Sequence, residues 1–233
     1  MQVSEGSVPG YMYLESENIF PNLKTLQLAF DGDASNLALL RHWQLPQLQH
    51  FEVTVGCADT ESATDSIQPL CNFLKVVGGT LTSLKIHFLG EWITLPSHLW
   101  ELVPHIVYLG VSILSPGILC PPPPPNHPLR TLANIETETG TASGVMYRNI
   151  EEWKGLTVVS DSHAWEKITP WTRGPSQPPF IHTHYNEDNL CGECIIDMHL
   201  LCTARGLRYE DAWGRTWKEY RDGDVAKVQL KQD

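Results

Sequence analysis

The sequence predicts an α/β fold in which short strands and helices alternate, as an irregular leucine-rich-repeat solenoid with a C-terminal capping helix and strand. The first observation is an apolar pattern, Leu-x-x-Leu-x-Leu or a near variant, that occurs six times. Its copies begin 25, 33, 25, 23 and 24 positions apart, near the period of ~20 to 29 residues that is typical of leucine-rich repeats. The second observation is that stretches with helical spacing lie between the copies, which favours units stacked on their neighbours.

Each copy predicts one strand whose consensus apolar side chains face inward. The copies are Leu23, Leu26, Leu28; Leu48, Phe51, Val53; Leu81, Leu84, Ile86; Ile106, Leu109, Val111; Leu129, Leu132, Ile135; and Trp153, Leu156, Val158. Helices are expected between them over residues 35–43, 64–77 and 96–102. The pair Gly78 and Gly79 is expected to end the second helix, and the length of that helix explains the interval of 33 residues.

The chain is predicted to have three parts. Residues 1–19 form an N-terminal capping segment, residues 20–185 hold the degenerate repeats, and residues 186–233 form a C-terminal cap. A loop at residues 115–128 interrupts the repeats, since its five consecutive prolines lack amide donors and favour an extended backbone. We interpret it as a spacer, with a ligand for a proline-binding module as the alternative. In the cap, an apolar stripe over residues 188–206 predicts a helix that ends at Gly206, followed by a strand.

Composition restricts the partners and the compartment. The net charge is −11, and neither half of the chain is basic, so nucleic acid is not an expected partner. No apolar run of 18 residues is present, so no membrane association is expected. No secretory signal is visible, and six cysteines in a chain of this length are expected to be reduced thiols. The expected location is cytoplasmic or nuclear.

One cluster of residues could bind a metal. His182, His184, Cys191 and Cys194 combine two imidazoles with a Cys-x-x-Cys step, which suits tetrahedral zinc. The competing interpretation is that Cys194 and Cys202 lie on the apolar stripe of the predicted helix and act as small buried hydrophobes. No cofactor is otherwise expected. Because no nucleophile elbow, phosphate loop or dinucleotide fingerprint is present, the chain is not predicted to be an enzyme.

The residues between the consensus apolar positions are expected to form an exposed, concave face. Side chains alternate along a strand, so these residues point away from the apolar ones. The candidates for partner binding are Gln27, His50, Glu52, Lys85, His87 and Tyr108, with Gly110, Gly155 and Thr157 at further positions of the same face. Trp171 and Trp213 are additional candidates for interface anchors, since tryptophan is enriched among residues that dominate binding.

Four segments together resemble a known group of proteins. They are FPNLKTLQL at 20–28, LPQLQHFEV at 45–53, LTSLKI at 81–86 after the glycine pair, and CTARGLRYED at 202–211. The chain resembles the leucine-rich-repeat region of fungal F-box-like proteins, although the F-box itself is not seen before Phe20. The resemblance implies a non-catalytic module that binds a protein partner through its concave repeat surface, a role related to substrate recruitment in ubiquitin ligases, while the ligase-docking role of the F-box is not carried over. The alternatives are a zinc-stabilised structural domain that uses the C-terminal His/Cys cluster, or a diverged fragment without retained activity.

Overall fold

The structure is a computed structural model of the 233-residue chain. It describes residues 2–3, 19–30, 37–38, 40, 42–56, 63–89, 95–111, 121–135, 152–161, 172–173, 199–210, 214, 216–222 and 225–230. The predicted segment at 35–43 is described only in part, at residues 37–38, 40 and 42–43. In that part, residues 37–38, 40 and 42 have 3₁₀ geometry rather than the α-helix expected there.

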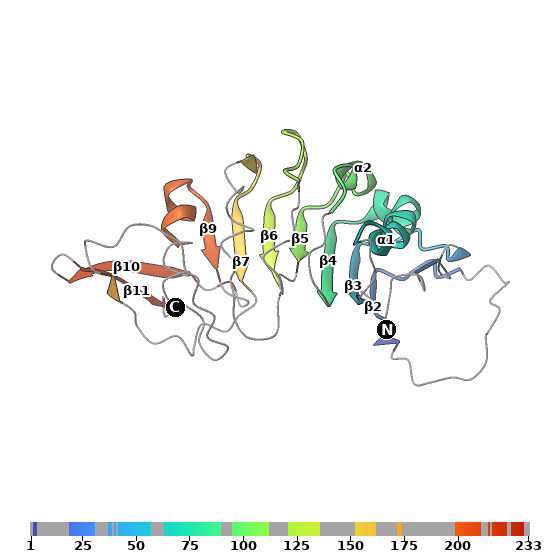
Figure 1. The fold of residues 1–233 in the computed structure, drawn as a ribbon, viewed down its shortest axis with the longest axis horizontal. Helices are drawn as coiled ribbons and strands as arrows, with labels where there is room; N and C mark the ends of the chain where they lie inside the picture. Colours follow the sequence, from blue (N-terminus) through green and yellow to red (C-terminus); the bar gives the residue numbers. More distant parts are fainter. Residues whose placement is uncertain are drawn as a thin grey trace.

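The main feature is an eight-stranded sheet in which every pair of neighbouring strands is parallel (Figure 1). In spatial order its strands are β1 (Gln2–Val3), β2 (Thr25–Ala29), β3 (His50–Gly56), β4 (Ser83–Leu89), β5 (Tyr108–Val111), β6 (Thr131–Asn134), β7 (Val158–Asp161) and β9 (Arg208–Glu210). Sequence order and spatial order agree, so each new strand joins the edge left by the one before it. A backbone ladder of this kind fixes the register of side chains from strand to strand.

Two α-helices lie at the upper edge of the sheet in Figure 1. The first, α1 (Ala63–Val77), confirms the helix predicted over 64–77 and passes directly into a 3₁₀ turn, η2 (Gly78–Thr80). The second, α2 (Leu99–Leu102), is one turn long and lies inside the segment predicted as 96–102. The pair Gly78 and Gly79 therefore ends α1 as expected. The backbone of Gly78 also lies so close to α2 that a Cβ at this position would collide with the carbonyl oxygen of Leu102.

The prediction of an irregular leucine-rich-repeat solenoid is wrong. The structure has one ordered, all-parallel sheet with few helices. In the part of the chain that it describes, α-helix is confined to α1, α2 and residues 199–204, so strand and helix do not alternate in similar units. The strand expected as a separate cap, β9, pairs with β7 as a member of the same sheet. The apolar pattern could not distinguish a leucine-rich-repeat solenoid from a continuous parallel sheet, because inward-facing apolar residues recur along the strands of both.

The register corrects the last two copies of the apolar pattern. Leu109 aligns with Leu132, and Leu132 aligns with Val159. The strand that corresponds to the sixth apolar copy is therefore β7, which begins at Val158. The predicted outward positions Gly155 and Thr157 precede this strand. In the fifth copy, Ile135 lies beyond β6, and its Cγ2 methyl would meet a Cβ placed on Gly110. In the fifth copy Leu132 keeps the expected alignment with Leu109 and only the third position differs, whereas in the sixth copy Val159 takes the place expected for Leu156.

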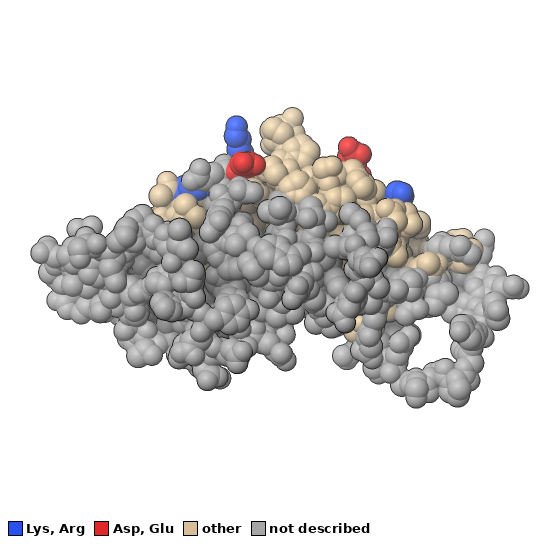
Figure 2. Space-filling view, in the orientation of Figure 1, with Lys and Arg blue, Asp and Glu red and all other residues tan. Residues whose placement is uncertain are grey.

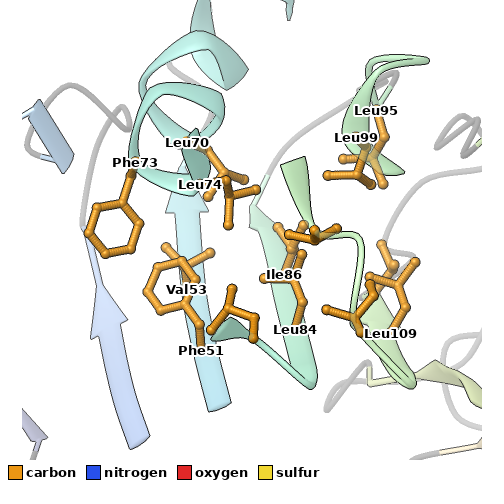
Figure 3. Close-up of a cluster of buried hydrophobic side chains, with 14 of the residues drawn as sticks. Phe51, Val53, Leu70, Phe73, Leu74, Leu84, Ile86, Leu95, Leu99 and Leu109 are labelled. Atoms are coloured by element: carbon orange, nitrogen blue, oxygen red, sulfur yellow. The ribbon is translucent and has the colours of Figure 1, made fainter. Parts of the chain in front are cut away.

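The core lies between the sheet and the segments that connect its strands. Figure 3 shows Phe51 and Val53 of β3 and Leu84 and Ile86 of β4 pointing toward side chains of α1 and of the segment around α2. The rings of Phe51 and Phe73 are tilted, with centroids 4.9 Å apart. Each such side chain contributes about 1.5–3 kcal/mol by leaving water. Because the apolar side chains fill this side of the sheet, its polar side chains are left on the opposite face.

The C-terminal region contains a hairpin that the sequence did not predict. Strands β10 (Trp217–Asp222) and β11 (Val225–Leu230) are antiparallel, and β11 also pairs with β8 (Thr172–Arg173). Before β9, residues 199–204 are helical, and the turn that follows them contains Gly206, whose φ of 70° lies in the left-handed region. The amide of Leu207 donates to the carbonyl of Cys202, and that of Gly206 donates to Thr203. These two bonds form a Schellman motif and confirm Gly206 as the end of the helix.

Candidate functional site: the polar face of the sheet

Strand alternation separates an apolar face from a polar one. In β2, Leu26 and Leu28 are buried while Thr25, Gln27 and Ala29 are exposed. The same alternation continues in β3 and β4, and the register aligns Tyr108 and Gly110 of β5 with the outward residues of β4, although Gly110 is buried. We define the polar face as the outward residues of β2 to β5: Thr25, Gln27, His50, Glu52, Thr54, Ser83, Lys85, His87, Tyr108 and Gly110. All six predicted partner-binding residues lie on it.

Glu52 connects three side chains of the polar face. Its Oε1 atom accepts a hydrogen bond of 2.9 Å from the Gln27 amide and lies 3.2 Å from Nε2 of His87. Its Oε2 atom lies 3.3 Å from Nζ of Lys85. The register explains this arrangement, because Gln27, Glu52 and Lys85 are direct neighbours across β2, β3 and β4. We call these four residues the Glu52 network.

The network is partly shielded from water. The exposed fractions of the Glu52 and His87 side chains are 26% and 19%. Burial lowers the pKa of His87, against the opposing effect of the Glu52 carboxylate, and Lys85 lowers it further. The imidazole is therefore neutral at physiological pH, and its Nε2–H donates to Glu52. In that state the Glu52 network has no net charge, because the negative charge of Glu52 is matched by the positive charge of Lys85.

Tyr108 lies beside the network on β5. Burial raises the pKa of its phenol, and the carboxylates of Glu52 and Glu210 raise it further. The hydroxyl therefore stays protonated at physiological pH and can act as donor or acceptor. Its ring packs over Gly110: a Cβ at that position would lie 3.2 Å from Cε1 of Tyr108 and 3.2 Å from Cγ of Lys85. The absence of a side chain at Gly110 thus allows Tyr108 and Lys85 to approach each other.

The far end of the sheet carries an ion pair that the sequence did not indicate. In β9, Nε of Arg208 lies 2.7 Å from Oε2 of Glu210. Both residues occupy outward positions, since Tyr209 between them is buried in the core. No local pattern indicates this pair, because the sequence predicts the strand as part of a separate cap. Between this pair and the Glu52 network, the outward positions Gly110 and Ala133 hold small buried residues.

The candidate zinc ligands His182, His184, Cys191 and Cys194 lie outside the described residues, as do Trp171 and Trp213. Among the residues that are described, no group of three or more His, Cys, Asp or Glu side chains could hold a metal ion. Cys202 is a buried free thiol, and burial raises its pKa to about 12. Such a thiol is protonated and inert, in agreement with its interpretation as a small buried hydrophobe.

A hollow of about 390 Å³ lies away from the polar face, beside the end of α1. Its lining consists of His42, Trp43, Gln44, Leu45, Pro46, Val76, Val77 and Thr80. The indole nitrogen of Trp43 is buried without a hydrogen-bond partner, and its ring packs on Phe20 with centroids 5.0 Å apart. The hollow brings together no titratable pair with catalytic geometry, so we do not assign chemistry to it.

Comparison with known proteins adds no family. No protein-family model matches the chain, and the search of curated proteins finds no similar sequence. Within the described segments, no helix has the length and apolar character needed to cross a membrane. Figure 2 shows isolated acidic and basic side chains on the described surface in that view, rather than a broad patch of one sign. The resemblance to F-box-like proteins stays a prediction.

Proposed function

We propose that the chain is a non-catalytic protein-interaction module that binds a protein partner through the polar face of β2 to β5. The observation that supports this proposal most directly is the Glu52 network. Four polar side chains from three strands are held in fixed positions on the face opposite the core. Fixed side chains lose little conformational entropy when a partner binds, which favours a binding surface over a merely solvated one.

The composition of the face supports a protein partner. Tyr108 offers a large ring with a polar tip, and tyrosine is enriched among residues that dominate protein interfaces. The opposite charges of Lys85 and Glu52 are paired at 3.3 Å, so the face does not offer the clustered cations that a phosphate backbone requires. By the resemblance described above, the partner would be a substrate recruited for ubiquitin transfer.

The proposal is tested by affinity capture with two triple variants. The first, Glu52→Ala/Lys85→Ala/Tyr108→Ala, removes the centre of the polar face. The matched control replaces Gln68, Asn72 and Lys75, three exposed residues of α1 that are hydrogen-bonded to one another. The two variants thus each remove a three-residue group from an exposed surface, but on different sides of the molecule.

We expect the polar-face variant to lose captured proteins that the wild type and the α1 variant retain. The α1 variant should unfold within about 1 kcal/mol of the wild type, because its three residues are exposed. The polar-face variant should lose about 1–3 kcal/mol, because it truncates the half-buried ring of Tyr108, and urea unfolding checks that it remains folded. Ubiquitin-ligase subunits among the lost proteins would support the role in ubiquitin transfer. Equal capture by all three proteins would move the binding surface away from β2 to β5 and reject the proposal.

A further inference from the structure

Two neighbouring rows of side chains on the polar face differ in their hydrogen bonding. Register places Thr25, His50, Ser83 and Tyr108 side by side on β2 to β5. We call these four residues the open row. The next row along the strands holds Gln27, Glu52 and Lys85, which belong to the Glu52 network. Neighbouring strands are ~4.8 Å apart, so His50 and Tyr108 are separated by about 10 Å across the sheet.

Both oxygens of the Glu52 carboxylate are occupied within the Glu52 network. Oε1 of Glu52 has two neighbours, Gln27 and His87, and Oε2 is occupied by Lys85. A partner carboxylate at Lys85 would lie close to the Glu52 carboxylate, and a partner cation at Glu52 would lie close to Lys85, so like-charge repulsion offsets part of what a new ion pair would contribute. The network therefore positions the neighbouring side chains better than it binds a charged ligand.

The open row has unused hydrogen-bonding groups. Within the part of the chain that the structure describes, no side chain or backbone group is hydrogen-bonded to the imidazole of His50, the hydroxyl of Ser83 or the phenol of Tyr108. His50 is exposed, and Ser83 and Tyr108 are half-buried. The row contains no Lys, Arg, Asp or Glu. Its free groups are those that pair with backbone amides and with uncharged polar side chains.

We infer that the open row makes the direct contacts of the proposed binding surface and takes an extended, uncharged polar segment of the partner protein. The Glu52 network lies beside this row and positions Lys85 through its ion pair with Glu52. Lys85 and the ring of Tyr108 both pack against Gly110, where a Cβ would lie 3.2 Å from Cγ of Lys85 and 3.2 Å from Cε1 of Tyr108. This inference rests on the proposed function. It adds the chemical class of the partner segment and the residues that recognise it.

The test uses random linear peptides displayed on phage and selected on the full chain. Selected peptides are synthesised and titrated against four proteins: the wild type, Tyr108→Phe, His50→Ala, and the charge-exchanged variant Glu52→Lys/Lys85→Glu. The exchange keeps one positive and one negative side chain facing each other while it inverts the field that a charged ligand would meet. Unfolding in urea checks that each variant is folded.

We expect selected peptides with few charged residues. Loss of one hydrogen bond should weaken binding about five- to tenfold in Tyr108→Phe and in His50→Ala. The charge exchange should weaken binding by less than about tenfold, because lysine at position 52 cannot accept from Gln27 or His87 and so disturbs the support of the open row. Between about 0.05 and 0.5 M salt the affinity of the wild type should change less than about twofold, since screening acts on charges.

Two other results have distinct meanings. Peptides rich in charge, whose binding is lost in the exchanged variant but kept in Tyr108→Phe and His50→Ala, would overturn the inference while the proposed function stands. Peptides that bind these variants and the polar-face triple variant as tightly as the wild type, or a selection that enriches none, would count against the proposed function and the inference together.

Discussion

Replacement of Gly110 by alanine is expected to distort the polar face from within. A Cβ at this position would lie 2.8 Å from Cγ2 of Ile135 and 3.2 Å from atoms of both Lys85 and Tyr108. All three distances are shorter than an ordinary van der Waals contact, so the neighbours must move. Overpacking of this kind costs about 1–3 kcal/mol. Alanine regains about 0.5–1 kcal/mol because it has less backbone freedom to lose than glycine. The expected net loss of stability is at most about 2.5 kcal/mol, with about 1 kcal/mol near the centre of the range.

The assay for Gly110→Ala has two readouts. Urea unfolding gives the free-energy change, and NMR of ¹³C-labelled tyrosine rings, with Tyr108→Phe for assignment, reports the displacement of the Tyr108 ring. The control is Gly79→Ala, where a Cβ has open space around it, and which should be neutral or stabilising by about 0.5 kcal/mol. Equal stability of the two variants, with an unchanged Tyr108 resonance, would refute the close packing over Gly110 and the support it gives to the site.

Two more predictions concern the fold around α1, α2 and β6. Gly78→Ala should destabilise the chain by at least about 2 kcal/mol, because the new Cβ would collide with the backbone carbonyl of Leu102. Urea unfolding of this variant and of Gly79→Ala measures the effect, and equal urea midpoints for the two variants would contradict it. Burial lowers the pKa of His127 below that in the unfolded chain, so the stability it contributes is complete above a pH of about 6.5 and is lost as the pH falls through its folded pKa. The urea midpoint should therefore decrease below that pH, and His127→Gln should reduce the slope; an identical slope in the variant would reject this role.

The buried contacts of His127 give the pH prediction its structural basis. Its Nδ1 accepts the amide of Leu129 at 3.2 Å, and Nε2 lies 3.2 Å from the carbonyl of Val103. Only the neutral ring protonated on Nε2 makes both bonds, and a proton on Nδ1 would break the first. The charges of His105 and Arg130 oppose the protonated ring as well. His127 also packs edge-on against Trp100, with ring centroids 4.9 Å apart.

Local patterns in the sequence predicted the strands β2 to β5 and the faces that their side chains occupy. Leu84 and Ile86 are fully buried, while Lys85 between them is on the polar face, as alternation requires. The helix α1 was predictable because its apolar residues recur at three- and four-residue spacing before two glycines. These properties depend on a few consecutive residues, and a single sequence contains them completely.

The organisation of the sheet depended on information that local patterns do not carry. Whether a strand continues a sheet or caps it is decided by hydrogen bonds to a distant segment, such as those between β7 and β9. The same limit applied to the site. Alternation placed Glu52 and Lys85 on one face, but it could not show that Glu52 accepts from Gln27 and His87 as well. That result depends on side-chain reach across a register that only the assembled sheet defines.

Under the proposed function, the register also assigns different roles to two rows of the polar face. The same parallel pairing that aligns Glu52 with Gln27 and Lys85 aligns His50 with Thr25 and Ser83. One row of the face therefore balances its charges internally, while the row beside it keeps its hydrogen-bonding groups free. A residue can then be essential for binding without touching the partner, because loss of Glu52 would release Lys85 and His87 beside the open row. Substitutions in the two rows should accordingly differ in kind: those in the open row remove contacts, and those at Glu52 disturb the support that holds those contacts in place.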